Sequence, residues 1–201
     1  TGKATNLKEN EFNTKVSTIK IGFGYIGDYA YYIQSADFKR QMDSANVEMK
    51  SQFKTRDARM IGSGKFNTKR ELTWKFAFMY EGTSEEWLVR ETGFTIGVPE
   101  LAGRFFVGRT KEGFSMIKVM NGHSPWGVER QTALDVIPIM ADGIKNFGYL
   151  PKPKIFWNLG YFNDVISHGQ GFSTFAWQYI ARVGFLPYYK QEEQKVLHLG
   201  A

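Results

Sequence analysis

The stretch STFAWQYIARVGFL, residues 173–186, indicates what kind of fold this chain has. Its apolar side chains recur at every second position, and the face that they share holds Phe175, Trp177, Tyr179, Ala181, Val183 and Phe185. Thr174, Gln178 and Arg182 lie on the opposite face. An alternation of period two predicts a β-strand. A strand of about 14 residues is roughly 45 Å long, or roughly 30 Å high when tilted by about 45°, which matches the thickness of a bilayer core.

The same alternation recurs along the chain. Leu72, Trp74, Phe76, Phe78 and Tyr80 share one face of a second strand. Further strands are expected at 19–25, 48–62, 88–97, 104–110, 155–163 and 195–201, which makes about eight in all. Short connections, such as 67–70, alternate with longer ones, such as 34–47, as they do in membrane barrels. We therefore predict an all-β fold, an antiparallel transmembrane β-barrel that forms a single domain over residues 1–201.

The composition agrees with a strand-rich protein. Aromatic residues make up 16% of the 201 residues, and there are 21 Gly but six Pro, which favours strands and turns over helices. No run of 18 apolar residues is present, so we expect no transmembrane helix. The first twenty residues are polar and lack the apolar centre of a signal peptide.

The composition also excludes several kinds of chemistry. The chain has no Cys, which excludes disulfides, thiolate metal sites and cysteine nucleophiles. The net charge of +6 and the pI of about 9.4 would suit a nucleic-acid partner, but the Lys and Arg residues are spread along the chain with no run longer than two. We expect no nucleic-acid partner, no metal, no cofactor and no catalytic residues, because no nucleophile, acid–base or metal-ligand motif stands out.

Residues 111–153 interrupt the series of strands. They show little alternation and contain Gly113, Gly122, Pro125, Gly127, Pro138, Pro151 and Pro153. A long insert of this kind within a compact domain is usually functional or disordered, and its apolar content argues against disorder. We expect this insert to be a loop that folds inward into the barrel lumen and narrows it.

Five segments, taken in order, resemble one known family. They are TRDARMIGSG (55–64), RFFVGRTKEG (104–113), GVERQTALDVIPIM (127–140), WNLGYFND (157–164) and GFLPYYKQEEQKVLHLGA (184–201). This series is similar to the phosphate-selective porin O and P family, and the similarity covers roughly residues 47–201. The matching positions include Arg56, Ala58, Arg59, Gly108, Lys111, Glu112, Glu129 and Thr132. The chain departs from the family pattern at Asp57, Arg109, Thr110 and Gly113.

The resemblance implies a bacterial outer-membrane porin, a homotrimer of sixteen-stranded barrels with a narrow basic lumen for phosphate or other small anions. It also implies contact with outer-membrane lipid. About eight strands are half of that number, and the chain ends within a strand at His198–Ala201. We therefore expect the sequence to be about the N-terminal half of a longer protein.

Residues that serve an anion pathway must point into the lumen and carry positive charge. Arg182 and Lys75 lie opposite apolar faces, so alternation predicts that both point inward. Arg56 and Arg59 fall on opposite faces of one strand, and the resemblance favours Arg59. Arg109, Lys111 and Arg130 belong to the insert or border it. The candidate pathway residues are thus Arg59, Lys75, Arg109, Lys111, Arg130 and Arg182.

Other interpretations remain open. The basic residues could be solvated loop or lumen charges without a role in selectivity. The chain could be a non-conducting outer-membrane barrel that serves as a scaffold or partner subunit of a larger envelope complex. It could also be a soluble β-sandwich that binds carbohydrate with its Trp and Tyr residues, in which case its apolar faces would turn inward. A barrel enzyme would require a convergent set of catalytic groups, which the sequence does not display.

Overall fold

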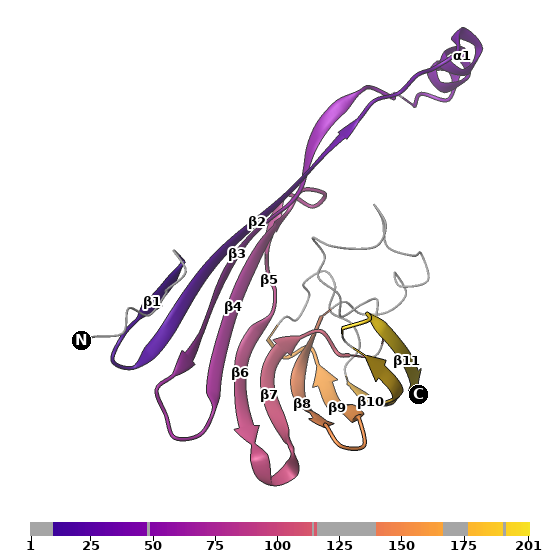
Figure 1. Ribbon diagram of the computed structural model, residues 1–201. Coiled ribbons are helices and arrows are strands. Elements are labelled where there is room, and N and C mark those ends of the chain that lie inside the picture. Colours follow the sequence, from indigo (N-terminus) through magenta and orange to yellow (C-terminus); the bar gives the residue numbers. More distant parts are fainter. Residues whose placement is uncertain (1–9, 48, 114, 116–139, 167–176, 191) are drawn as a thin grey trace.

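The computed structural model describes residues 10–47, 49–113, 115, 140–166, 177–190 and 192–201. Within these ranges the chain forms one antiparallel sheet of eleven strands (Figure 1). The strands are β1 (Glu11–Asn13), β2 (Ser17–Ala30), β3 (Gln52–Phe66), β4 (Leu72–Glu81), β5 (Glu86–Val89), β6 (Thr92–Val98), β7 (Gly103–Thr110), β8 (Ala141–Leu150), β9 (Ile155–Asn163), β10 (Gln178–Lys190) and β11 (Lys195–Gly200). The prediction of an all-β antiparallel fold is confirmed.

The strands follow one another in the sheet in the order of the chain. The path runs from β1 to β11, and β5 lies off it because it pairs with the far end of β4. The sheet is strongly curved and encloses a hollow, with β1 and β11 as its two edges (Figure 1). Within the described part of the chain these edges do not pair with each other, so the sheet is open and a closed barrel is not formed.

The eight predicted strands are present, with corrections to their number and bounds. Residues 88–97 span two strands, β5 and β6, and β1 is an additional short strand. β8 lies inside the predicted insert 111–153, so the prediction of a loop over this whole range is wrong from Ala141 to Leu150. β10 begins at Gln178, and residues 173–176 of the stretch quoted first lie outside the described residues.

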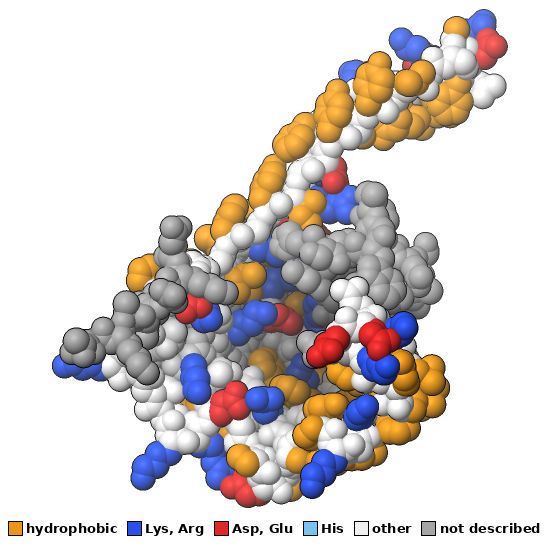
Figure 2. Space-filling model, in the orientation of Figure 1, with side chains coloured by type: hydrophobic (Ala, Val, Ile, Leu, Met, Phe, Trp, Pro, Cys, Tyr) orange, Lys and Arg blue, Asp and Glu red, His pale blue; other side chains and the backbone are white. Residues whose placement is uncertain are grey.

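The hairpin of β2 and β3 projects far beyond the other strands (Figure 1). β2 pairs with β3 along its whole length, but β4 pairs with β3 only between Asp57 and Lys65. The outer end of the hairpin, from Gly27 to Arg56, is therefore not paired with β4. Tyr29 and Phe53 pair across this end and are both exposed, and hydrophobic side chains follow the hairpin in Figure 2.

A helix, α1 (Ala36–Ser44), lies at the tip of this hairpin, where the sequence predicted a plain loop over 34–47. Ser35 caps it, because its side chain accepts a hydrogen bond from the Phe38 backbone N–H at 3.2 Å. Asn46 follows the helix with a positive φ of 56°, as is usual just beyond a helix end. The helix was missed because nine residues contain too few turns to show a helical period. No helix of the described residues is long and apolar enough to span a membrane.

The two faces of the sheet differ in character. Strand register places one apolar row across six strands, and its members are Trp74, Phe94, Val107, Ile144, Tyr161 and Tyr179. All of them except Trp74 are exposed. We call this side the outer face. The adjacent row belongs to the inner face, which lines the hollow, and consists of Asn13, Thr18, Lys65, Thr73, Thr95, Phe106, Lys145, Gly160 and Ile180.

Candidate functional site

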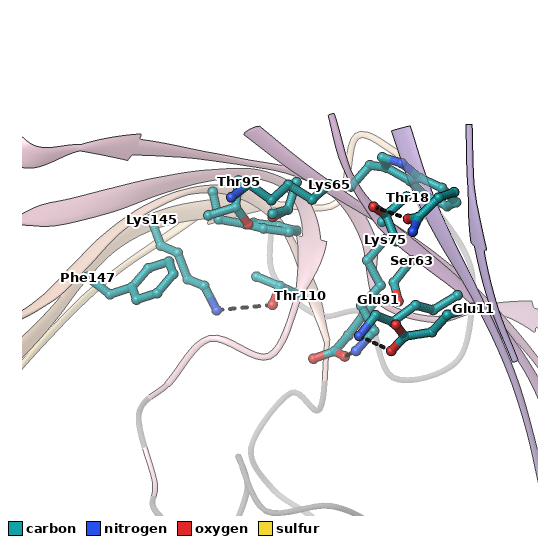
Figure 3. Close-up of a pocket in the computed structure, with 16 residues that line it drawn as sticks. Glu11, Thr18, Ser63, Lys65, Lys75, Glu91, Thr95, Thr110, Lys145 and Phe147 are labelled. Carbon is teal, nitrogen blue, oxygen red and sulfur yellow. Dashed lines mark hydrogen bonds and ion pairs between the residues drawn. The ribbon is translucent and has the colours of Figure 1, made fainter. Parts of the chain in front are cut away.

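The hollow contains a cavity of about 680 Å³ that we call the hydroxyl cavity. Side chains from β1 to β4 and from β6 to β8 line it (Figure 3). Its hydroxyl groups belong to Thr18, Ser63, Thr73, Thr95 and Thr110, and its charged groups to Glu11, Lys20, Lys65, Lys75, Glu91 and Lys145. Three aromatic residues, Trp74, Phe106 and Phe147, also line it.

A second cavity, of about 700 Å³, lies on the inner face nearer the projecting hairpin, and we call it the arginine cavity. Its basic residues are Arg59 from β3, Lys75 from β4, Arg90 from the β5–β6 junction and Lys111 from the segment after β7. Glycine backbone from β2 and apolar side chains such as Ile61 complete its wall. Figure 2 shows Lys, Arg, Asp and Glu side chains gathered in the hollow to which both cavities belong.

Lys75 and Glu91 line both cavities, and their side chains form an ion pair. A β-bulge accounts for the place of Glu91. Phe78 pairs with Val89, and Lys75 pairs with Gly93, so three steps along β4 match four steps along the neighbouring strand. The extra residue lets Arg90 and Glu91, neighbours in sequence, both face the arginine cavity. Bulges commonly redirect a side chain in this way near functional sites.

The charge that faces the two cavities is positive. Among the described residues, seven Lys or Arg side chains and two Glu side chains line them, a formal balance of +5. Part of this charge is offset within the wall, because Lys20 pairs with Glu11 at 2.5 Å and Arg59 pairs with Asp57. The Lys20–Glu11 pair is partly exposed and therefore screened by water and salt, whereas the Arg59–Asp57 pair is largely buried.

Lys145, on β8, has uncharged hydrogen-bond partners. Its ammonium donates hydrogen bonds to Thr110 Oγ1 and to the Lys111 carbonyl oxygen, each at 3.1 Å. It also lies 5.4 Å from the ring centre of Phe106 and 5.5 Å from that of Phe147, within the range of cation–π attraction. Two of its three N–H donors are therefore satisfied by uncharged partners in the described part of the chain.

The segment after β7 lies against the inner face. Lys145 donates to the Lys111 carbonyl, and Asn158 Nδ2 donates to the Glu112 carbonyl at 3.3 Å. Asn158 shares a row with Phe147, so both donors belong to the inner face. Gly113 follows with a positive φ of 88°, and a Cβ there would meet Asn158 Nδ2 at 1.6 Å. The residues that begin the predicted insert thus turn toward the hollow, while 116–139 lie outside the described residues.

Three of the six residues predicted for the anion pathway come together. Arg59, Lys75 and Lys111 all line the arginine cavity, although they come from β3, β4 and the segment after β7. Arg56, the alternative to Arg59, instead pairs with Asp28 at 2.6 Å beside a register shift between Ile26 and Gly27.

Arg109 has a different place from the one expected. It is 1% exposed and lines neither cavity. Its guanidinium pairs with Asp142 at 3.2 Å, and its Nε donates to the Val89 carbonyl oxygen at 2.9 Å. Asp142 in turn accepts a hydrogen bond from the Ile166 backbone N–H at 2.6 Å. Arg109 therefore joins β7, β8 and the end of β5 inside the wall, as a structural group.

Arg182 shares a row with Asn158 and Phe147, so it belongs to the inner face as alternation predicted. Its guanidinium lies 5.7 Å from the ring centre of Phe156, and it lines neither of the two cavities. Arg130, the sixth predicted residue, lies outside the described residues.

Sequence reasoning missed four of the basic residues and both acidic residues of the two cavities. The basic ones are Lys20, Lys65, Arg90 and Lys145, and the acidic ones are Glu11 and Glu91. Alternation could have placed Lys20, which lies between Ile19 and Ile21. Lys145 was hidden by its assignment to the insert, and the bulge at Arg90 and Glu91 breaks the period on which alternation depends.

Within the described ranges, no group of three or more His, Asp or Glu side chains is placed to hold a metal ion. Comparisons with protein families, with curated proteins and with solved structures found no match to this chain.

Proposed function

We propose that this chain forms part of the wall of an outer-membrane β-barrel pore through which small anions, phosphate among them, diffuse passively. The observation that carries the proposal is the division of the sheet into an exposed apolar outer face and a basic, hollowed inner face. A soluble sheet buries its apolar face, whereas a membrane barrel turns it to lipid and lines its lumen with polar groups.

The outer face supports a lipid environment. Side chains such as Phe94, Val107 and Ile144 lie next to one another across three strands and are exposed. A continuous apolar surface of this kind is unfavourable in water and favourable against acyl chains. The same feature speaks against a soluble β-sandwich, because a sandwich packs its apolar faces together.

The inner face supports anion passage. Conduction needs positive charge strong enough to attract an anion and weak enough to release it. The two cavities have a positive balance, and Glu11 and Glu91 in the same wall moderate it. Selectivity for phosphate, a homotrimeric assembly and closure of the sheet into a sixteen-stranded barrel are parts of this proposal that rest on the family resemblance.

The test is the reversal potential of the intact native protein in a planar bilayer under a KCl gradient. We expect a reversal potential with the sign that an anion-selective pore gives, and a lower conductance when phosphate is added. Lys75→Gln and Arg59→Gln should each move the potential toward zero, because each removes a positive charge from the arginine cavity. Lys152→Gln, in the exposed β8–β9 turn, is the matched control and should leave the potential unchanged.

A potential on the cation side would contradict the proposal. Lack of conductance from protein that has folded in lipid would also contradict it, and would favour the scaffold or partner-subunit alternative.

A further inference from the structure

The hydroxyl cavity contains hydrogen-bonding groups that the rest of the described chain leaves unused. The Ser63, Thr73 and Thr95 hydroxyls line it, and none of them has a hydrogen bond within the described residues. Lys65 lies in the same row as the two threonines and has no ion pair with a described residue. Figure 3 shows Ser63, Lys65 and Thr95 among the residues that line this cavity.

The kinds of group in this wall distinguish between ligands. An inorganic oxyanion chiefly accepts hydrogen bonds, so it would use the donors of the wall and leave its acceptors idle. Each hydroxyl is both a donor and an acceptor. Asn13 and Glu11 also line the cavity with acceptor oxygens, which already contact Thr18 and Lys20. A ligand that matches this wall must therefore donate as well as accept at several positions, as a polyhydroxylated molecule does.

The cavity also provides a charged anchor and an apolar surface. Lys145 lies on β8, on the far side of the hydroxyls from Lys65, and one of its three N–H donors is not taken up by Thr110 or Lys111. Phe147 lies beside it and lines the cavity with its ring. A sugar ring presents C–H groups that pack on an aromatic ring, while its hydroxyls reach polar groups around it.

We propose that the hydroxyl cavity is a binding subsite for a monosaccharide that carries one anionic group, a phosphate or a carboxylate. Lys145 binds the anionic group, and Thr73 and Thr95 bind the sugar hydroxyls. A volume of about 680 Å³ is within the range of small-molecule sites and leaves room for water around such a ligand. The proposal deepens the proposed function, on which it rests, by naming a class of solute that the pore would carry.

The experiment compares four probes on the intact native protein: glucose 6-phosphate, glucuronate, glucose and inorganic phosphate. Binding is measured by calorimetry in detergent, and channel block is measured in planar bilayers. We expect glucose 6-phosphate and glucuronate to bind at least fivefold more tightly than inorganic phosphate, and glucose to bind more weakly than either sugar anion.

Two sets of variants assign the contacts. Thr73→Val with Thr95→Val removes both hydroxyls while keeping the β-branched shape that strands favour, and should weaken glucose 6-phosphate about tenfold with little effect on inorganic phosphate. Lys145→Gln should weaken the binding of both glucose 6-phosphate and inorganic phosphate. Thr83→Val, in the exposed β4–β5 turn, is the matched control and should leave the affinity for both ligands unchanged.

The outcomes separate this inference from the function on which it rests. Binding of the sugar anions no tighter than that of inorganic phosphate would overturn the inference, as would a double threonine variant that binds like the wild type. Either result leaves the anion pore standing if the reversal potential is on the anion side. Tight, threonine-dependent binding by a protein that does not conduct would support the subsite and overturn the pore.

Discussion

At the scale of single residues, the inner wall combines charges that attract an anion with charges that moderate the attraction. Lys75 and Glu91 show this most directly, since they pair with each other at the place where the two cavities meet. Lys111 and Lys145 also act electrostatically on Glu91. One carboxylate thus interacts with several ammonium groups, and its removal should change the selectivity of the proposed pore more than the loss of an exposed acid.

Glu91→Gln is expected to move the reversal potential further toward the anion side, because it removes the counter-charge of Lys75 and keeps the size of the side chain. The measurement is again the potential under a KCl gradient. Glu86→Gln, an exposed acid at the start of β5, serves as the control. An unchanged or opposite shift for Glu91→Gln would mean that this carboxylate does not face the conduction path.

Arg109→Met is expected to destabilise the protein by about 3–5 kcal/mol, because it leaves the carboxylate of Asp142 buried without its ion pair. Arg70→Met is the control, since Arg70 and Glu100 form an exposed pair for which about 0–1 kcal/mol is usual. Unfolding by urea in lipid vesicles, followed by tryptophan fluorescence, measures both. Equal effects of the two substitutions would contradict a structural role for Arg109.

At the scale of elements, three glycines bring neighbouring strands and side chains close together. Gly93, Gly108 and Gly143 face one another in register across β6, β7 and β8 on the inner face. Phe162 continues this row on β9 and is fully buried. A Cβ on Gly143 would meet the Tyr161 carbonyl oxygen at 2.0 Å. The row therefore requires glycine for close approach.

Gly108→Ala is expected to destabilise the protein by more than about 1 kcal/mol, since φ is +135° there and a Cβ would meet the Thr92 carbonyl oxygen at 2.2 Å. Gly22→Ala is the control on β2, where the nearest atom to a new Cβ is 3.9 Å away. That change should be neutral or should stabilise by about 0.4–1 kcal/mol. Urea unfolding in lipid vesicles measures the stability of both variants. Equal stabilities would show that the glycine row of β6, β7 and β8 tolerates a Cβ.

At the scale of the whole molecule, the curvature of the sheet gives its two faces different surroundings. Charged side chains gather in the hollow (Figure 2), and large apolar side chains such as Phe94, Val107 and Ile144 are exposed on the outer face. The proposed membrane location turns this difference into a prediction about two adjacent residues. Phe94 is on the outer face and Thr95 is on the inner face, one position apart on β6.

Phe94→Lys is expected to reduce folding into lipid vesicles strongly, because a lysine on the lipid side of a barrel costs about 2–4 kcal/mol near the bilayer midplane. Thr95→Lys should be tolerated better, because the new ammonium would face the polar hollow that residue 95 lines. The shift in gel mobility between folded and heated samples measures the folded fraction. Similar losses for both variants would argue against a lipid-facing outer surface.

Local pattern was sufficient for most of the strands, though not for β1 or β8, and for the side on which many residues lie. The alternation at Leu72–Tyr80 predicted that Lys75 lies opposite the apolar face, and register places it on the inner face. The same period placed Arg182 correctly. This works because successive side chains of a strand point to opposite sides whatever the rest of the chain does.

Other features had no local signal. The period fails at Arg90 and Glu91, where a bulge directs both side chains inward. Arg109 carries the same charge as its predicted companions, yet a partner 33 positions away, Asp142, takes it into the wall. Whether a charge meets solvent or a counter-ion depends on which strand lies beside it, and that is a property of the sheet.

The sequence by itself thus determined the class of fold, the antiparallel strands and the inward direction of Lys75 and Arg182, because these follow from side chains that alternate along a single strand. The tertiary structure alone decided that Arg59, Lys75 and Lys111 share a cavity, that Lys145 belongs to the wall and that Arg109 does not. Those outcomes depend on register, on a bulge and on curvature, which arise only when distant strands pair.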